Sequence, residues 1–315
     1  MPLEDFLDIR PHVQDALASG KPLVALESTI ITHGLPRPVN LETARGCEDT
    51  VRSHGAVPAT IGIHDGKLVV GLESQEIAEL ANADDVAKTN LSNLAMVIAG
   101  GGYGATSVST TLLAARLAGI RVVATGGIGG VHRGFGEVFD ISSDLTSLAH
   151  AGGVLVSAGA KVILDVAATR EHLETLGIPV VGWRTDWFPL FYSVGRDIAV
   201  DYRVEDASAV ARGLHTHEAL GLETTMLVVA DPPEEDALDP ELLGEAIEHA
   251  QAEAHEDGIT GRDVTPYLLA RIKDLTQGES LRANLSLIHN NCAIAAQIAC
   301  ALAKSGTKAA EPAAV

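Results

Sequence analysis

Two charged residues interrupt apolar stretches and could carry covalent or proton-transfer chemistry. Lys161 lies in the run SAGAKVILDVAA, among small and apolar neighbours. An amine in such surroundings loses the solvation that favours its ammonium form, so a nucleophilic free amine becomes available near neutral pH. The alternative is a lysine that opens a helix and extends its amine to water. The residue alone leaves both interpretations open, and its context favours the first.

Glu27 follows the β-type apolar run PLVAL and precedes Ser28 and Thr29. A carboxylate at the end of a strand fit for burial has two explanations. It lies at an edge and faces water, or it lies in a cleft where the loss of water raises its pKa. We favour the second explanation, which makes Glu27 a candidate general acid or base.

The segment EVFDISSDL holds a cluster of carboxylates and hydroxyls. Asp140 lies where a strand-like run ends, and such a carboxylate beside a phosphate-binding turn can hold a hard divalent cation with several waters. Ser142, Ser143 and Asp144 begin the helix-like SSDLTSLAH, so helix capping alone would explain them.

Two glycine-rich turns follow strand-like runs, at residues 100–107 and 126–134, and the first of them precedes a helix-like run. Backbone N–H groups and hydroxyls at the N-terminus of a helix can hold phosphate, although neither turn matches a P-loop or a dinucleotide-binding motif. Lys88, in a predicted loop, either is solvated or binds an anion. His132 and Arg133 either bind phosphate or ribose or brace their turn.

The remaining chain supplies the elements that position these residues. Short aliphatic strands alternate with amphipathic helices, and aromatic residues make up only 3% of the chain. This pattern predicts an α/β fold, a three-layer α/β/α sandwich around a central mixed sheet. Asp65-Gly66 predicts a small β-hairpin elaboration. We expect one domain over residues 1–303 and a disordered tail over 304–315.

The predicted elements can be given by residue range. Strands are expected at 22–29, 58–64, 67–72, 94–99, 120–125, 137–142, 178–184 and 225–230, and helices at 11–18, 41–54, 74–81, 108–119, 142–150, 207–220, 240–255, 265–277 and 280–303.

Charge and cysteine content narrow the possible partners and location. A formal net charge of -20 repels nucleic acid and anionic membrane surfaces. The three cysteines have no metal-type spacing and cannot form a disulfide framework. The acidic N-terminus is no signal peptide, and we expect no segment apolar enough to span a membrane. The sequence therefore predicts a cytoplasmic protein.

Asn284, Asn290 and Asn291 are unusual in the apolar C-terminal helix, because their amides need hydrogen-bond partners. They either cap or bridge helices or read the hydrogen-bonding ring of a ligand. The aromatic segment at 183–192 is the other unusual stretch.

Six long and irregular motifs together carry a resemblance to a known family. They are ALESTIITHGLPRPVN, GATSVSTT, ATGGIGGVHRG, FDISSDL, SAGAK and SLRAN. The chain resembles the pseudouridine-5'-phosphate glycosidases, a family that includes indigoidine synthase A-like proteins, from about residue 23 to residue 303. The segment 183–192 is an aromatic-rich version of a variable region, and its Asp186 could alter an entrance or a subunit contact.

The resemblance implies an activity and a set of site residues. The family reversibly cleaves the C–C bond of pseudouridine 5'-phosphate, which gives uracil and ribose 5-phosphate. By similarity, Lys161 forms a Schiff base with C1' of the opened sugar, and Glu27 is the proton donor. Asp140 matches a carboxylate that holds one Mn²⁺ ion largely through waters. The positions that match substrate contacts are Lys88, Val108, Ser142, Ser143, Asp144 and Asn284. The resemblance also implies an α/β/α sandwich and a homotrimer.

The chemistry of the residues agrees with this assignment. An acid cannot simply protonate away a carbon leaving group, so a C-glycoside needs an electron sink at C1', which an iminium on a nucleophilic lysine provides. One rival is a Schiff-base aldolase that acts on another sugar phosphate. A second rival is a sugar-phosphate sensor without turnover, although a binder has no need for a buried amine. A role in an indigoidine-type pathway also stays open.

Overall fold

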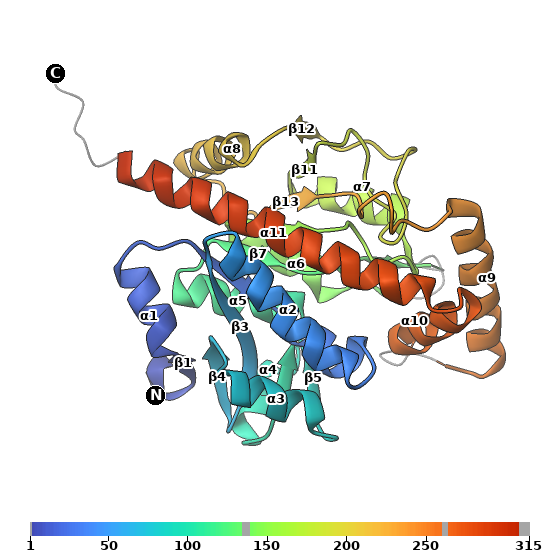
Figure 1. Ribbon diagram of the computed structural model, residues 1–315, viewed down its shortest axis with the longest axis horizontal. Helices are drawn as coiled ribbons and strands as arrows, with labels where there is room; N and C mark the ends of the chain where they lie inside the picture. Colours follow the sequence, from blue (N-terminus) through green and yellow to red (C-terminus); the bar gives the residue numbers. More distant parts are fainter. Residues whose placement is uncertain (1, 134–138, 260–263, 309–315) are drawn as a thin grey trace.

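A large, mostly parallel sheet runs through the middle of the protein (Figure 1). The computed structural model describes residues 2–133, 139–259 and 264–308. Within them the sheet has 11 strands, and its main path follows the order β1-β4-β3-β2-β7-β9-β13-β11-β12. The strands are β1 (Leu7–Ile9), β2 (Leu23–Leu26), β3 (Val57–His64), β4 (Lys67–Val70), β5 (Ala87–Thr89), β6 (Gly104–Thr106), β7 (Val122–Ala124), β9 (Val154–Ser157), β11 (Val180–Trp183), β12 (Tyr202–Val204) and β13 (Met226–Val229).

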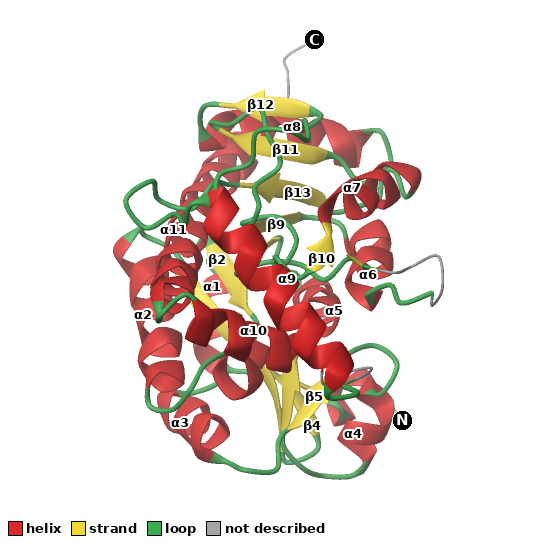
Figure 2. Ribbon diagram, turned by 90° about the vertical axis from the view of Figure 1, so that its right-hand side faces the viewer, coloured by secondary structure: helices red, strands yellow, loops and turns green. Residues whose placement is uncertain are grey.

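Helices cover both faces of this sheet, which confirms the predicted three-layer α/β/α sandwich (Figure 2). One layer contains α2, α8 and α11, and the other contains α5, α6 and α7. The helices are α1 (Pro11–Ala18), α2 (Val39–Ser53), α3 (Ser74–Asn82), α4 (Leu94–Ala99), α5 (Val108–Ala118), α6 (Ser143–Ala151), α7 (Val166–Thr175), α8 (Ala207–Ala219), α9 (Pro240–Glu256), α10 (Val264–Leu275) and α11 (Glu279–Lys308).

The strands nearest the centre are parallel, and their side chains are buried on both faces. β2 pairs with β3 and β7, β7 with β9, and β9 with β13, all in parallel. Strands buried on both faces read as continuous aliphatic runs, and the burial of β2, β7, β9 and β13 agrees with this. The predicted hairpin is confirmed, since β3 and β4 are antiparallel and turn at Asp65-Gly66.

Two predicted strands are wrong. Residues 94–99 form α4, in which Leu94, Val97 and Ile98 pack on the core while Met96 is 75% exposed. That spacing is helical, but it is too short to be recognised in a six-residue apolar run. In the described part of 137–142, Ile141 forms a single antiparallel β-bridge with Val131, and His132 N–H donates to the Asp140 carbonyl at 3.0 Å, but this pairing does not extend into a strand. Residues 137 and 138 lie outside the described residues.

The long C-terminal helix α11 also differs from expectation. It continues to Lys308, so residues 304–308 are helical and do not belong to a tail, while 309–315 lie outside the described residues. Its stretch Glu279–Ser305 is long and apolar enough to cross a membrane by length and composition alone, with 56% of the tested window buried. The asparagines within α11 interrupt its apolar sequence, so the sequence did not indicate a stretch long and apolar enough to span a membrane. In the structure, α11 packs against α2, α8 and the central strands, as a core helix does (Figure 1).

Candidate active site

The carboxyl ends of three adjacent parallel strands meet at one edge of the sheet. Glu27 follows β2, residues 125–130 follow β7, and residues 158–161 follow β9. This edge is where open α/β sheets place their ligands. Two cavities open there. The inner cavity has about 530 Å³ of empty volume and is lined by Glu27, Asn284 and Phe191, and the polar cavity has about 1360 Å³ and is lined by Asp140, Ser142 and Ser143.

Lys161 and Lys88 line both cavities and so join them into one site. Lys161 is half-buried and follows a backbone bridge between Ile128 and Ala160, and its N–H donates to the Ile128 carbonyl at 3.0 Å. Lys88 lies in β5, which pairs with β6, and not in the loop that the sequence predicted. The site thus carries two cations in a strongly acidic protein.

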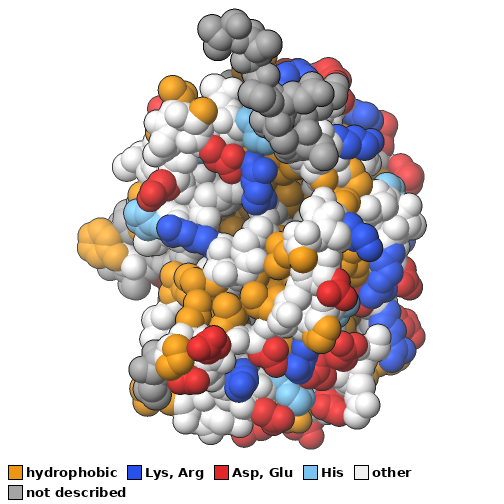
Figure 3. Space-filling view, turned by 90° about the vertical axis from the view of Figure 1, so that its left-hand side faces the viewer, with side chains coloured by type: hydrophobic (Ala, Val, Ile, Leu, Met, Phe, Trp, Pro, Cys, Tyr) orange, Lys and Arg blue, Asp and Glu red, His pale blue; other side chains and the backbone are white. Residues whose placement is uncertain are grey.

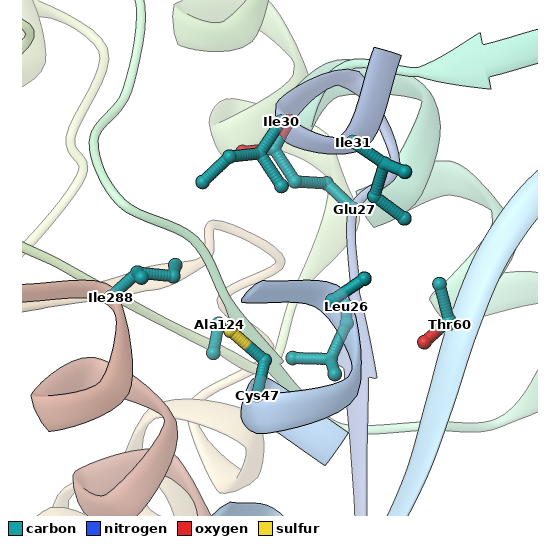
Figure 4. Close-up of a pocket in the computed structure, with 9 residues that line it drawn as sticks. Leu26, Glu27, Ile30, Ile31, Cys47, Thr60, Ala124 and Ile288 are labelled. Atoms are coloured by element: carbon teal, nitrogen blue, oxygen red, sulfur yellow. The ribbon is translucent and has the colours of Figure 1, made fainter. Parts of the chain in front are cut away.

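Glu27 faces the inner cavity, but its carboxyl group is surrounded by protein atoms, and this loss of water raises its pKa. The positive charge of Lys161 and a hydrogen bond donated by the Thr125 hydroxyl lower the pKa in part. A small cavity next to Glu27 is lined almost entirely by apolar side chains, among them Ile30, Ile31 and Ile288 (Figure 4). The expectation of a cleft carboxyl with a raised pKa is therefore confirmed.

Asp144 joins two of the predicted motifs. It is 4% exposed, and its carboxylate accepts the N–H of Ser109 at 2.9 Å and the N–H of Gly129 at 2.8 Å. Ser142 caps α6 by accepting the N–H of Asp144 at 3.2 Å, as its residue type predicted. A side chain at Gly129 would collide with Ser142, because a Cβ there would lie 2.2 Å from the Ser142 hydroxyl oxygen. These contacts hold the N-terminus of α5, the glycine turn and the N-terminus of α6 together.

The N-termini of α5 and α6 therefore lie at the polar cavity. Ser107, which precedes α5, and Ser142 and Ser143 line it. The Val108 side chain, also predicted to contact substrate, is 1% exposed and is not among the residues that line either cavity. The positive ends of two helix dipoles, with hydroxyls and lysines nearby, suit a phosphate group.

Asp140 and His132 form the side of the polar cavity where a cation would fit. Asp140 is about half exposed, and its carboxylate lies 3.8 Å from His132 Nδ1. Among the described residues no cluster of three or more His, Cys, Asp or Glu side chains is placed to hold a metal. One carboxylate with an open, polar surround fits a hard divalent cation that keeps most of its waters, and does not fit a closed protein cage. Arg133 is exposed at the surface.

The three asparagines of α11 divide between the roles expected for them. Asn284 is 8% exposed and lines the inner cavity. Asn291 donates to the Thr125 carbonyl at 2.8 Å and the Gly126 carbonyl at 3.2 Å, and Asn290 donates to the Asp231 carbonyl at 3.3 Å. Asn290 and Asn291 thus bridge α11 to loops at the sheet edge.

Sequence reasoning missed His33, Thr125 and Phe191. His33 lines the inner cavity. Its pKa is lowered mainly by partial burial and to a smaller extent by the positive charge of Lys88. Phe191, at φ 64°, packs against Gly127, where an added Cβ would lie 2.5 Å from its ring. The aromatic segment therefore reaches the site, whereas Asp186 in the same segment pairs with Arg203 at 2.9 Å. The motif ITHG, which follows the strand that ends at Glu27, could have pointed to His33 as a site residue. No local sequence pattern indicated that Phe191 would reach the site.

Comparisons with known proteins identify relatives of this chain. The family model for indigoidine synthase A like protein matches residues 12–301. The chain is 49% identical to a pseudouridine-5'-phosphate glycosidase of Caldanaerobacter subterraneus over 95% of this chain and 97% of that protein. It is 48% identical to the protein of the same name from Hahella chejuensis, over 93% of this chain and 97% of that protein.

Two solved structures share the fold over nearly the whole chain. The prealnumycin C-glycosynthase AlnA, solved in complex with ribulose 5-phosphate, superposes with a TM-score of 0.89 at 38% identity, covering 96% of this chain and 99% of that one. An indigoidine synthase A-like protein from Thermotoga maritima superposes with a TM-score of 0.85 at 38% identity, covering 95% and 97%. The chain therefore belongs to the indigoidine synthase A-like family, whose members include the pseudouridine-5'-phosphate glycosidases.

Proposed function

We propose that this protein reversibly cleaves the C–C bond between uracil C5 and ribose C1' in pseudouridine 5'-phosphate, and releases uracil and ribose 5-phosphate. The observation that carries the proposal is the meeting of Glu27 and Lys161 in one cavity. The charge of Lys161 acts directly on the Glu27 carboxyl group. A nucleophilic amine beside a carboxyl group with a raised pKa is the pair that this reaction needs.

The chain's own residues account for each part of the reaction. The amine of Lys161 adds to C1' as the C1'–O4' bond opens, and the proton that the nitrogen then gives up goes to O4'. The nitrogen lone pair then forms the C1'=N bond, and the electron pair of the C1'–C5 bond goes to C5, which takes a proton from Glu27. Water hydrolyses the resulting iminium, which frees ribose 5-phosphate, regenerates the amine of Lys161 and returns a proton to Glu27.

The substrate would lie across both cavities. Its phosphate would accept hydrogen bonds at the polar cavity from the N-termini of α5 and α6, Ser142 and Ser143, with Lys88 offsetting its charge. Its base would lie in the inner cavity beside Asn284. Asp140, with His132 beside it, would hold a Mn²⁺ ion through few protein contacts, and this ion when bound would offset negative charge on the substrate.

Release of uracil tests this proposal. Purified protein is incubated with pseudouridine 5'-phosphate and Mn²⁺, and uracil and ribose 5-phosphate are measured by chromatography. We expect both products in equal amounts from the wild type, and none from Lys161→Ala. An aldolase acting on another sugar phosphate, or a sensor, would release no uracil, and that result would refute the proposal.

A further inference from the structure

A further cavity adjoins the inner one and belongs to no step described above. This outer cavity has about 690 Å³ of empty volume and lies between the segment 32–36, α10 and α11. Tyr192, Lys273 and Leu281 line it, and none of these is among the residues that line the inner cavity.

Four residues line both cavities and therefore lie between them: His33, Gly34, Leu269 and Asn284. Gly34 has no side chain, and His33 and Asn284 are polar. Leu269 contributes the apolar part of this partition, and it is half-buried on α10, where it packs against the core. The volume of its side chain therefore sets how far the inner cavity extends toward the outer one.

Two neighbouring residues of the aromatic segment lie on opposite sides of this partition. Phe191 lines the inner cavity and Tyr192 lines the outer cavity, with their ring centroids 4.5 Å apart and their planes tilted by 44°. Both residues are nearly fully buried, at 3% exposure. These two rings are therefore fixed parts of the walls, whereas Leu269 belongs to a helix outside the sheet.

A salt bridge and a hydrogen bond join α10 to the C-terminal half of α9 and the residue that follows it. Arg271 donates to the Glu253 carboxylate of α9 at 2.5 Å and 2.7 Å, and the Tyr267 hydroxyl donates to Asp257 at 2.6 Å. Leu269 lies between these two anchors along the helix. Because its backbone is held on both sides, shortening its side chain should enlarge the cavity and leave α10 in place.

We propose that Leu269 determines specificity for the base: its side chain closes the inner cavity and restricts the carbon nucleophile to an unsubstituted single ring such as uracil. This inference rests on the proposed function, because it assigns the base to the inner cavity beside Asn284. Removing most of the Leu269 side chain would join the inner and outer cavities and admit a uracil that carries a large apolar substituent.

The reverse reaction tests this inference. Ribose 5-phosphate is supplied with uracil, or with uracil that carries one benzyl group at N1, N3 or C6, since each of these keeps the C5–H that reacts. C-nucleotide products are measured by mass spectrometry for the wild type, Leu269→Ala and Leu281→Ala. Leu281→Ala is the matched control, because it enlarges the outer cavity and leaves the partition intact.

We expect the wild type and Leu281→Ala to use uracil and to exclude all three benzyl derivatives. Leu269→Ala should raise the rate with at least one derivative about tenfold or more, a usual effect of pocket size on discrimination. No gain with any derivative, or equal use by the wild type, would overturn the inference. Leu269→Val, a smaller truncation, replaces Leu269→Ala if that variant does not fold, and the same gain is required of it.

The uracil reaction of the wild type separates the two proposals. If the wild type makes no pseudouridine 5'-phosphate from uracil and ribose 5-phosphate, the proposed function fails. If it does so and Leu269→Ala gains nothing, the specificity assignment alone fails.

Discussion

Glu27 owes its chemistry to its surroundings. The apolar side chains around it favour the protonated form, while Lys161 and Thr125 limit the rise of its pKa. A carboxyl group held in this balance can keep a proton at a pH where ordinary glutamates have lost theirs, and can still release it to a carbanion at C5.

Replacing Thr125 should shift the pH dependence of the reaction in a defined direction. The Thr125 hydroxyl donates to the Glu27 carboxylate and lowers its pKa, so Thr125→Val should raise that pKa further. If Glu27 acts as an acid, activity falls as pH rises through its pKa. The alkaline limb of the kcat/KM profile should therefore move to higher pH. Thr125→Ser keeps the donor and should stay close to the wild type, and a limb that moves to lower pH contradicts this role.

Glu27→Gln should separate activity from stability. We expect kcat to fall by about 10² to 10⁴, the usual contribution of a general acid. Because folding raises the pKa of Glu27, the folded state binds the proton more tightly than the unfolded chain does. This stabilising contribution is complete below the ordinary glutamate pKa of 4.5 and is lost as pH rises through the folded pKa. Urea unfolding at several pH values should show the wild type losing stability relative to Glu27→Gln as pH rises. A constant difference would rule this linkage out.

At the scale of elements, the site depends on contacts that join helix ends to loops. Asp144 holds the N-terminus of α5 and the 126–130 turn with two hydrogen bonds, and Asn291 holds the end of β7 to α11. Each contact joins segments far apart in the sequence.

Asp144→Asn should destabilise the fold more than the same change at Asp140. Each oxygen of the Asp144 carboxylate now accepts a backbone N–H. In Asp144→Asn the side-chain NH₂ group replaces one of these oxygens and cannot accept, so one buried backbone N–H loses its partner, which costs about 2 kcal/mol or more. Asp140 is half exposed, so Asp140→Asn should change the free energy of unfolding by less than about 0.5 kcal/mol. Urea unfolding of the two variants measures this difference, and equal losses would contradict the bridging role of Asp144.

The sequence predicted the elements whose signals are local. The helix start at Ser142, the hairpin turn at Asp65-Gly66 and the aliphatic central strands follow from capping, turn and burial patterns. Lys161 and Glu27 were recognisable because charged residues interrupt apolar runs.

Other features depend on tertiary contacts that no local pattern records. Residues 94–99 have too few residues to distinguish a helix from a strand, and Phe191 reaches the site only because its loop folds back onto Gly127. Thr125 contributes to the site because its hydroxyl donates to Glu27, which follows a different strand. The role proposed for Leu269 depends on two cavities that meet at α10.

The whole molecule carries a formal net charge of -20, although its proposed substrate is an anion. On the face shown in Figure 3, acidic and basic side chains are interspersed around a band of hydrophobic side chains. The overall field of the protein should therefore repel the substrate at long range, while Lys88 and Lys161 attract it within the site.

This contrast predicts an unusual dependence on salt. Raising the ionic strength from about 0.01 M to about 0.1 M shortens the screening length from about 30 Å to about 10 Å, which weakens the long-range repulsion more than the contacts inside the cavity. We expect kcat/KM for pseudouridine 5'-phosphate to rise several-fold over this range. Thermal unfolding over the same range controls for effects on stability. A fall in kcat/KM would show that the local cations dominate at all distances.

The covalent role of Lys161 is the centre of this account, and one measurement tests it most directly. The wild type and Lys161→Ala are incubated with ribose 5-phosphate, Mn²⁺ and borohydride, and their intact masses are compared. The account predicts a reduced sugar-phosphate adduct on the wild type and none on Lys161→Ala. Folded wild-type protein without an adduct, or an adduct that persists in Lys161→Ala, would contradict it.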